Sequence, residues 1–305
     1  MNNNFPIPIL LIAFNRPDTT RQVFETIRKI KPERFFFAVD GPRKNRAGEE
    51  KNCLEVQEII KQIDWDCEVK TLFRKENLGC KMGVSSAINW FFENVDEGII
   101  LEDDCVPDQS FFSFCEKMLE KYRNNQEIMH INGTNSQFGE KFGLYSYYFS
   151  HCPQVWGWAT WKRVWNKYDI EMTDLEQFIK TKKTLSLFKN KKVANFWNDL
   201  FKYAKKTNIN TWDIQWSYSV MNFSGLAITP NVNLVENIGF GTNSTHTSEI
   251  NTKLRQKADS LLKIEDPQEI KVEIEADYKL FKKIYFRSVF TKIKSKILSQ
   301  FKKNG

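Results

Sequence analysis

The sequence predicts an α/β fold in which a mostly parallel sheet is flanked by helices. Short apolar runs alternate with segments whose apolar residues recur at helical spacing, which is the pattern of βαβ units. Several of these runs are followed directly by acidic, asparagine or glycine residues, as expected at the carboxyl ends of buried strands. With 305 residues, of which 41% are hydrophobic and 27% charged, the chain can bury the core of one large domain.

The first hundred residues contain alternating strands and helices. The expected strands are apolar or alternate in polarity, and the expected helices carry apolar residues three or four positions apart, with Asp18 or Thr19 capping the first. In order, we expect a strand from Ile7 to Phe14, a helix from Arg21 to Ile30, a strand from Phe35 to Val39, a helix from Glu49 to Ile63, a strand from Glu68 to Phe73, a helix from Val84 to Phe92 and a strand from Ile99 to Leu101.

The second half has a less regular pattern and no fixed repeat. A long stretch rich in glycine and aromatic residues, ending near Trp161, is expected to be a loop. Around it we expect a helix from Phe111 to Tyr122, a strand from Ile128 to Ile131, helices from Leu175 to Lys180, from Ala194 to Lys205 and from Trp212 to Phe223, and a strand from Gly225 to Ile228.

Composition excludes several classes of protein. The amino-terminal apolar run of about seven residues lacks a basic leader and is cut by Pro6 and Pro8, so it predicts a strand and not a signal peptide or membrane anchor. No other window approaches the roughly 20 apolar residues that a spanning helix needs. The six cysteines form no CxxC pair, which favours free thiols in a reducing cytosol over disulfides or a zinc site.

The net charge of +7 is concentrated at the carboxyl end of the chain. Residues 278–305 contain nine basic residues and no acidic residue, which leaves a net charge of −2 for the preceding body. A nearly neutral body gives little support to a nucleic-acid-binding role.

Three consecutive acidic residues, Glu102, Asp103 and Asp104, follow the apolar run Gly98 to Leu101. The carboxyl end of a buried parallel strand lies where open α/β sheets bind ligands, so we expect these carboxylates at a cleft. Carboxylates gathered side by side repel one another and favour a hard divalent cation, Mg²⁺ or Mn²⁺ with a phosphate. The alternative is a solvated acidic turn that caps the helix beginning near Asp108.

Polar residues at the other expected strand ends suggest half of a nucleotide site. Asn15 and Arg16 follow the first strand and Asp40 the second. Asp40 could accept a hydrogen bond from a ribose or a uracil N–H, while Arg16, Arg74 and Lys81 could neutralise phosphate. The alternative is a simple turn at Asp40 with solvated basic residues. The GxxxxGK[ST] and GxGxxG motifs are both absent, which weakens ATPase, kinase and dinucleotide interpretations.

The ordered segments IAFNRP, AVDGP, ENLGCKMGVSSAINW and ILEDD resemble a glycosyltransferase of the GT-A fold over roughly the first 135 residues. EDD, WDIQW and STH further resemble the inverting N-acetylglucosaminyltransferase I type and its bacterial relatives. The resemblance implies that Asp104 ligates Mn²⁺ or Mg²⁺, that Asp103 lies near the ribose or a metal-bound water, and that Glu102 shapes the site. It also implies that His246 completes the metal shell, although the chain carries ExD overlapping DD where the family has DxD.

Two aromatic segments are candidates for the acceptor side. Asp213 lies in NTWDIQWSY, where flanking tryptophans would partly desolvate the carboxylate and strengthen it as a general base; capping of the following helix is the alternative. The segment VWGWATWKRVW could stack sugars on Trp156 and Trp158, with Gly157 allowing close approach of the backbone, or could pack in the core.

These features predict a metal-dependent inverting glycosyltransferase that moves a sugar from a nucleotide-diphospho-sugar, with UDP as the expected leaving group, to a glycan. Residues 1–250 would form the GT-A domain, with 1–135 binding the nucleotide-sugar and 136–250 the acceptor; residues 251–305 would be a charged helical extension. Phe281, Tyr285 and three later apolar residues recur at near-helical spacing, which predicts a basic amphipathic helix. Such a helix would lie on the inner membrane face, close to a lipid-linked acceptor of surface polysaccharide assembly. The alternative is a helix that packs on the body. A sugar-phosphate nucleotidyltransferase and a catalytically silent sugar-binding protein are the alternatives.

Overall fold

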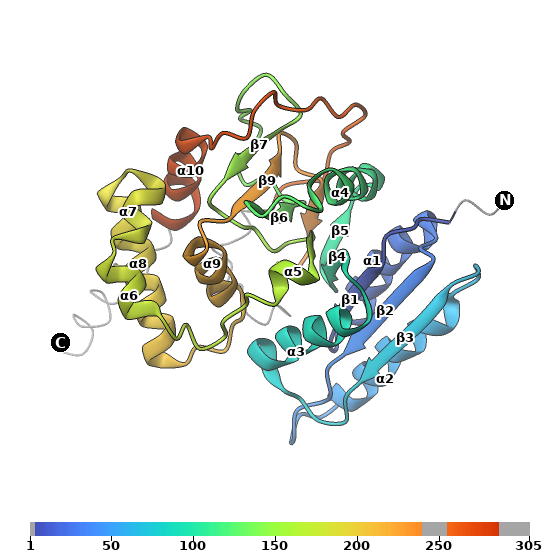
Figure 1. Cartoon of the computed structure of the whole chain (residues 1–305). Helices are drawn as coiled ribbons and strands as arrows, with labels where there is room; N and C mark the ends of the chain where they lie inside the picture. The colour runs from blue at the N-terminus through green and yellow to red at the C-terminus, as the bar shows by residue number, and fades with distance from the viewer. Residues whose placement is uncertain (1–3, 240–254, 287–305) are drawn as a thin grey trace, which may run out of the picture.

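The computed structural model describes residues 4–239 and 255–286, which form a mixed α/β fold around an eight-stranded sheet (Figure 1). The strand order is β3-β2-β1-β4-β8-β6-β9-β7, and six of the eight strands run in one direction. The predicted fold class, a mostly parallel sheet flanked by helices, is confirmed. The strands of this sheet are β1 Ile9–Ala13, β2 Arg34–Val39, β3 Glu68–Phe73, β4 Glu97–Glu102, β6 Ile128–Asn132, β7 Tyr147–Ser150, β8 Trp158–Trp161 and β9 Leu226–Pro230.

The first four strands are parallel, and their predicted positions agree with the structure to within two residues at each end. All five residues of β1 are buried, as expected for a strand covered by helices on both faces. β3 forms the edge of the sheet and alternates between exposed and half-buried residues. The carboxyl ends of these strands therefore meet at one side of the sheet.

The helices pack on both faces of the sheet and in a separate group beside it (Figure 1). α1 begins at Pro17 with Arg16 at its N-cap, ahead of the predicted caps Asp18 and Thr19, because proline fits the first helical position, where its missing N–H costs nothing. The helices are α1 Pro17–Ile30, α2 Glu49–Glu58 with a 3₁₀ turn at Ile59–Gln62, α3 Gly79–Asn94, α4 Gln109–Tyr122, α5 Lys162–Trp165, α6 Leu175–Lys180, α7 Lys183–Phe188, α8 Lys191–Thr207, α9 Asp213–Asn222 and α10 Ile274–Leu280, which continues as a π-helical turn over Phe281–Phe286.

The stretch expected to be a loop up to Trp161 instead contributes two strands to the sheet. β8 lies antiparallel between β4 and β6, and β7 forms the far edge beside β9. Each has only four residues, so neither produces a clear alternating pattern. A second, two-stranded sheet pairs β5 (Cys105–Pro107) with β10 (Val235–Asn237) directly beyond the acidic triplet.

Residues 255–273 contain no helix, so the predicted helical extension is wrong over this stretch. This segment returns along the body instead: Asp259 N donates to Asn233 O at 2.7 Å, and Ser146 N donates to Glu265 O at 3.0 Å. The predicted amphipathic helix falls largely outside the described residues, but Phe281 at its start is buried against the body.

All six cysteines are free thiols, as predicted. Among residues 4–239 and 255–286, no helix is both long enough and apolar enough to span a bilayer.

Candidate active site

A cavity of about 420 Å³ opens at the carboxyl ends of β1, β2 and β4. This is the side of an open α/β sheet at which ligands bind, because strand order reverses there and loops diverge. Much of the predicted constellation lines it: Arg16, Asp40, Arg74, Glu102, Asp103, Asp104, Trp156 and Asp213. Residues from both predicted halves of the chain therefore face one space.

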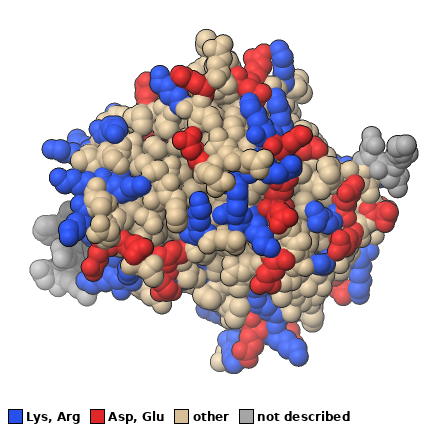
Figure 2. All heavy atoms as spheres, viewed as in Figure 1, with Lys and Arg blue, Asp and Glu red and all other residues tan. Residues whose placement is uncertain are grey.

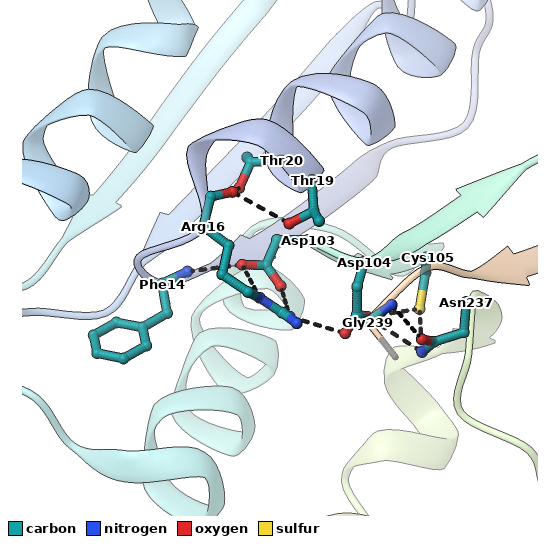
Figure 3. Close-up of polar contacts among 9 residues, drawn as sticks. All are labelled: Phe14, Arg16, Thr19, Thr20, Asp103, Asp104, Cys105, Asn237 and Gly239. Carbon is teal, nitrogen blue, oxygen red and sulfur yellow. Dashed lines mark hydrogen bonds and ion pairs between the residues drawn. The ribbon is translucent and has the colours of Figure 1, made fainter. Parts of the chain in front are cut away.

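Arg16 connects two carboxylates of the acidic triplet (Figure 3). Its Nη2 contacts Asp103 and donates to Asp104 Oδ2 at 2.9 Å, while its Nε donates to Asp103 Oδ2 at 3.3 Å. Burial lowers the pKa of the guanidinium, but the two carboxylates raise it above the ordinary arginine value. Arg16 is thus a permanent positive charge in the floor of the cavity.

Glu102, the last residue of β4, adds a third acidic group. Burial, and to a lesser extent the neighbouring Asp104, Asp103 and Asp213, raise the pKa of its carboxyl to about 8, although Arg16 lowers it. Glu102 is therefore mostly protonated near neutral pH. One guanidinium does not balance all of the acids in this part of the cavity, so additional positive charge is favoured there.

Asp40 forms hydrogen bonds with the loop that precedes α3. Its carboxylate accepts hydrogen bonds from Gly41 N at 3.1 Å, Asn77 Nδ2 at 2.9 Å and Leu78 N at 3.1 Å. Burial raises the pKa of Asp40, although the backbone donors and Arg74 lower it. The hydrogen bonds of Asp40 thus agree with the alternative interpretation, in which Asp40 stabilises a turn. Asp40 nevertheless also lines the cavity.

Arg74 and Arg43 add positive charge to the side of the cavity formed by the first half of the chain. Arg74 Nη2 donates to Ser86 Oγ at 2.8 Å, and within the described residues the structure gives Arg74 no ion pair. Arg43 pairs with Glu49 and lies over the Phe14 ring, 5.5 Å from its centroid. The sequence analysis missed Arg43 because it lies in a turn with no recognisable motif.

Asp213 is the first residue of α9, one position after the N-cap Trp212. Its carboxylate accepts a hydrogen bond from Thr211 Oγ1 and gains from the helix dipole. The Trp212 ring stacks on Trp158 with centroids 5.6 Å apart, and Trp158 stacks on the buried His130 at 4.9 Å. A rigid aromatic stack therefore supports the wall that carries Asp213.

Trp158 and Gly157 were predicted to contact an acceptor, and the structure contradicts both assignments. Trp158 is fully buried within the aromatic stack. Gly157 has φ +66° and packs so closely that a Cβ would stand 2.7 Å from a methyl of Val235. Neither residue lines the cavity, whereas Trp156 does.

Lys81 and Asn15 were predicted to bind the nucleotide, but neither lines the cavity. Both form hydrogen bonds with other residues of this chain instead. Lys81 Nζ donates to Asn208 Oδ1 at 2.9 Å, and its backbone N donates to Asn210 Oδ1 at 2.9 Å. Asn15 Nδ2 donates to Glu49 Oε1 at 2.9 Å. Lys81 thus joins α3 to the loop before α9, a contact across 129 residues that no local pattern could have indicated.

The predicted metal site is only partly within the described residues, because His246 lies outside them. Within residues 4–239 and 255–286, no group of three His, Cys, Asp or Glu side chains is arranged to hold a metal ion. The carboxylates nevertheless fit Mg²⁺ or Mn²⁺, since such ions are often held by one or two carboxylates plus the oxygens of a bound phosphate. A Cβ at Gly239 would stand 2.1 Å from Asp104 Oδ2, so a larger residue at position 239 would clash with this carboxylate.

No family model and no curated protein matches this chain. Similar solved structures include HddC from Yersinia pseudotuberculosis (9% identity, TM-score 0.33, covering 53% of this chain and 80% of HddC). TarS 1-349 from S. aureus has 7% identity and a TM-score of 0.40, covering 74% of this chain and 58% of TarS. The inositol-1-phosphate CTP transferase from T. maritima has 10% identity and a TM-score of 0.30, covering 53% and 74%. These likenesses are too distant to carry a functional conclusion.

Proposed function

We propose that this protein is a metal-dependent inverting glycosyltransferase that uses a nucleotide-diphospho-sugar, with UDP as the leaving group. The observation that carries the proposal is the cavity itself, in which arginines and a carboxylate cluster from the first half face a carboxylate and tryptophans from the second half. A donor bound at the first group would present its anomeric carbon to an acceptor at the second.

The nucleotide side would hold the donor through charge and shape. Arg74 lines the cavity and would pair with a phosphate oxygen, a strong charge-assisted contact. Phe14 lies in the same wall with Arg43 over its ring, and this pair would contact the base. Asp40 and its hydrogen-bonded loop would fix the ribose end of the site.

Arg16, Asp103 and Asp104 would act on the diphosphate. A bound Mn²⁺ or Mg²⁺, held by Asp104 and completed by His246, would neutralise the departing diphosphate. Arg16 holds the two carboxylates in place and adds fixed positive charge beside them. Preorganised charge of this kind stabilises a transition state in which negative charge develops on the leaving group.

Asp213 would be the general base. Its carboxylate would take the proton from an acceptor hydroxyl, which then attacks the anomeric carbon as the bond to the diphosphate breaks and the configuration inverts. Glu102 is a poorer candidate, because a carboxyl with a pKa of about 8 is mostly protonated at neutral pH. Trp156, at the cavity wall, would stack on the acceptor glycan.

We further propose a lipid-linked glycan acceptor in surface polysaccharide assembly, with the enzyme at the inner membrane face. The support is the segment after Phe286, which carries six basic residues and no acidic residue up to Gly305. Such a segment is attracted to anionic lipid.

The reaction class is tested by the products. Purified protein incubated with Mn²⁺ and single UDP-sugars should release UDP slowly by hydrolysis even without the natural acceptor. A nucleotidyltransferase would instead release pyrophosphate from UTP and a sugar 1-phosphate, and a silent binding protein would release neither. Pyrophosphate, or binding with no UDP release under any condition, would contradict the proposal.

A further inference from the structure

The three helices α6, α7 and α8 carry a concentrated positive charge on the folded body. Residues 175–207 contain nine lysines and two acidic residues, a net charge of +7, which leaves −9 for the rest of residues 1–277. The body is nearly neutral in total, but its positive charge is concentrated in these three helices and the remainder is strongly negative. Figure 2 shows lysine and arginine atoms gathered at the left edge, where Figure 1 places α7 and α8.

These lysines are exposed and lack carboxylate partners. All except Lys183 are exposed, and within the described residues none of them forms an ion pair. Elsewhere on the body many lysines are paired, such as Lys121 with Asp266 and Lys279 with Glu140. The nine are Lys180, Lys182, Lys183, Lys189, Lys191, Lys192, Lys202, Lys205 and Lys206.

The charge also forms a continuous stripe. In a helix with 3.6 residues per turn, Lys191, Lys202, Lys205 and Lys206 of α8 fall within an arc of roughly 100°. The opposite side of α8 is buried through Trp197 and Phe201 in a core shared with α6, α7 and α9. Lys205 Nζ donates to Met172 O at 2.7 Å, while Lys191, Lys202 and Lys206 are exposed on a helix held by this core.

Two further contacts relate this face to the rest of the molecule. Phe281 packs edge-on against Phe196 of α8, with centroids 5.4 Å apart, so the basic end of the chain starts beside the lysines. At its other end α8 leads directly into residues 208–212, which include Asn210, Thr211 and Trp212 of the cavity wall. The carboxyl end of α8, which carries Lys202, Lys205 and Lys206, is thus only a few residues along the chain from the cavity wall.

We infer that the α6–α8 lysine face docks the folded body on an anionic phospholipid surface. The contact is electrostatic, with lysine ammonium groups at lipid phosphates, and it turns the Asn210–Asp213 wall toward the membrane, where a lipid-linked acceptor lies. This inference rests on the proposed membrane location but not on the reaction, so binding and catalysis can fail separately.

The test compares two matched variants of the full-length chain. The first replaces Lys180, Lys182, Lys191 and Lys192 by glutamine. The control replaces four exposed lysines on the nucleotide half that also lack an ion pair in the described structure, Lys29, Lys31, Lys51 and Lys75. Neither set lines the cavity. Each protein is sedimented with vesicles of phosphatidylcholine alone or with phosphatidylglycerol, at low and high salt.

The face variant should lose about tenfold or more of its partition onto phosphatidylglycerol vesicles, because a lysine near an anionic surface contributes about a factor of five. The control should bind like the unmodified protein, and high salt should abolish the difference. Equal binding by the two variants would overturn the inference. The inference would also be overturned if vesicle binding were lost only when the lysines after Phe286 are replaced. A face variant that lost binding to RNA but still bound the vesicles would likewise contradict it. UDP release in solution should be unchanged in both variants, and failure of UDP release in every protein would count against the proposed reaction alone.

Discussion

Arg16 Nη2 lies 2.9 Å from Asp104 Oδ2 while the same guanidinium also holds Asp103, so one arginine satisfies two adjacent carboxylates. Asp103 has only 5% of its side chain exposed. Replacing Arg16 by methionine would leave a buried carboxylate without its partner. We expect a loss of stability on the order of 3 kcal/mol in urea unfolding at pH 7.

The control for Arg16 is Arg21→Met, which removes an ion pair with Glu55 in which both side chains are more than a third exposed. Exposed pairs contribute about 1 kcal/mol or less. Similar losses in the two variants would show that the Arg16 pairing is not a buried structural contact.

Trp156 and Trp158 are two residues apart and should behave differently when replaced by alanine. Trp158 is fully buried between His130 and Trp212, so its loss should cost about 3–5 kcal/mol of stability. Trp156 is half-buried at the cavity wall, so its loss should leave the melting temperature nearly unchanged but raise the KM for acceptor. Calorimetry together with acceptor kinetics checks both, and the reverse pattern would contradict the assignment.

Asp213→Asn keeps the size of the side chain and its place at the start of α9, but removes the base. Donor affinity should remain while transfer falls by roughly 10² or more. Asp199→Asn, an exposed change on α8, serves as the control and should leave transfer intact. NMR of the product reports the anomeric configuration; retention of the donor's configuration would exclude both the inverting mechanism and this role.

Asp277 predicts a pH dependence of stability. Its carboxyl, buried in α10, accepts hydrogen bonds from Ser150 Oγ at 2.5 Å and His151 N at 3.1 Å, and burial raises its pKa to about 7 from an ordinary value of 3.8. The folded chain therefore holds this proton between about pH 4 and 7 while the unfolded chain releases it. This group's contribution to stability is lost as pH rises through that window.

Asp277→Asn cannot titrate and should remove this part of the pH dependence. Urea unfolding at several pH values between 4 and 8 should give a flatter stability profile for the variant than for the unmodified protein. Profiles that remain parallel would show that Asp277 is charged in the fold throughout.

The sequence predicted the first half of the fold well because its central strands, β1, β2 and β4, are largely buried. A run such as Phe35 to Val39 is short, rich in aromatic residues and followed by turn residues, which favours a buried strand over a helix. Strands β7 and β8 were missed because four residues rich in aromatics carry no period. These segments are strands because they pair with β4, β6 and β9, which are distant from them in the sequence.

The candidate site was predictable where a side chain directly follows a strand, as with Asp40, Asp103 and Asp104. It was not predictable where a residue's partner comes from a distant segment. Lys81 appeared to be a phosphate ligand because its contacts with Asn208 and Asn210 cannot be read locally. Trp158 appeared to be a sugar platform because its burial depends on His130 and Trp212.

Donor binding is the most direct test of the central claim, that the cavity binds a nucleotide-diphospho-sugar with a metal. UDP and a panel of UDP-sugars would be titrated calorimetrically into the protein with Mn²⁺ or with EDTA, and into Asp104→Ala and Arg74→Gln. We expect at least one donor to bind in Mn²⁺ and to raise the melting temperature by mass action, with binding weakened by EDTA and by both substitutions. If no nucleotide binds, or if affinity is the same in EDTA and in both variants, the proposed donor site is wrong.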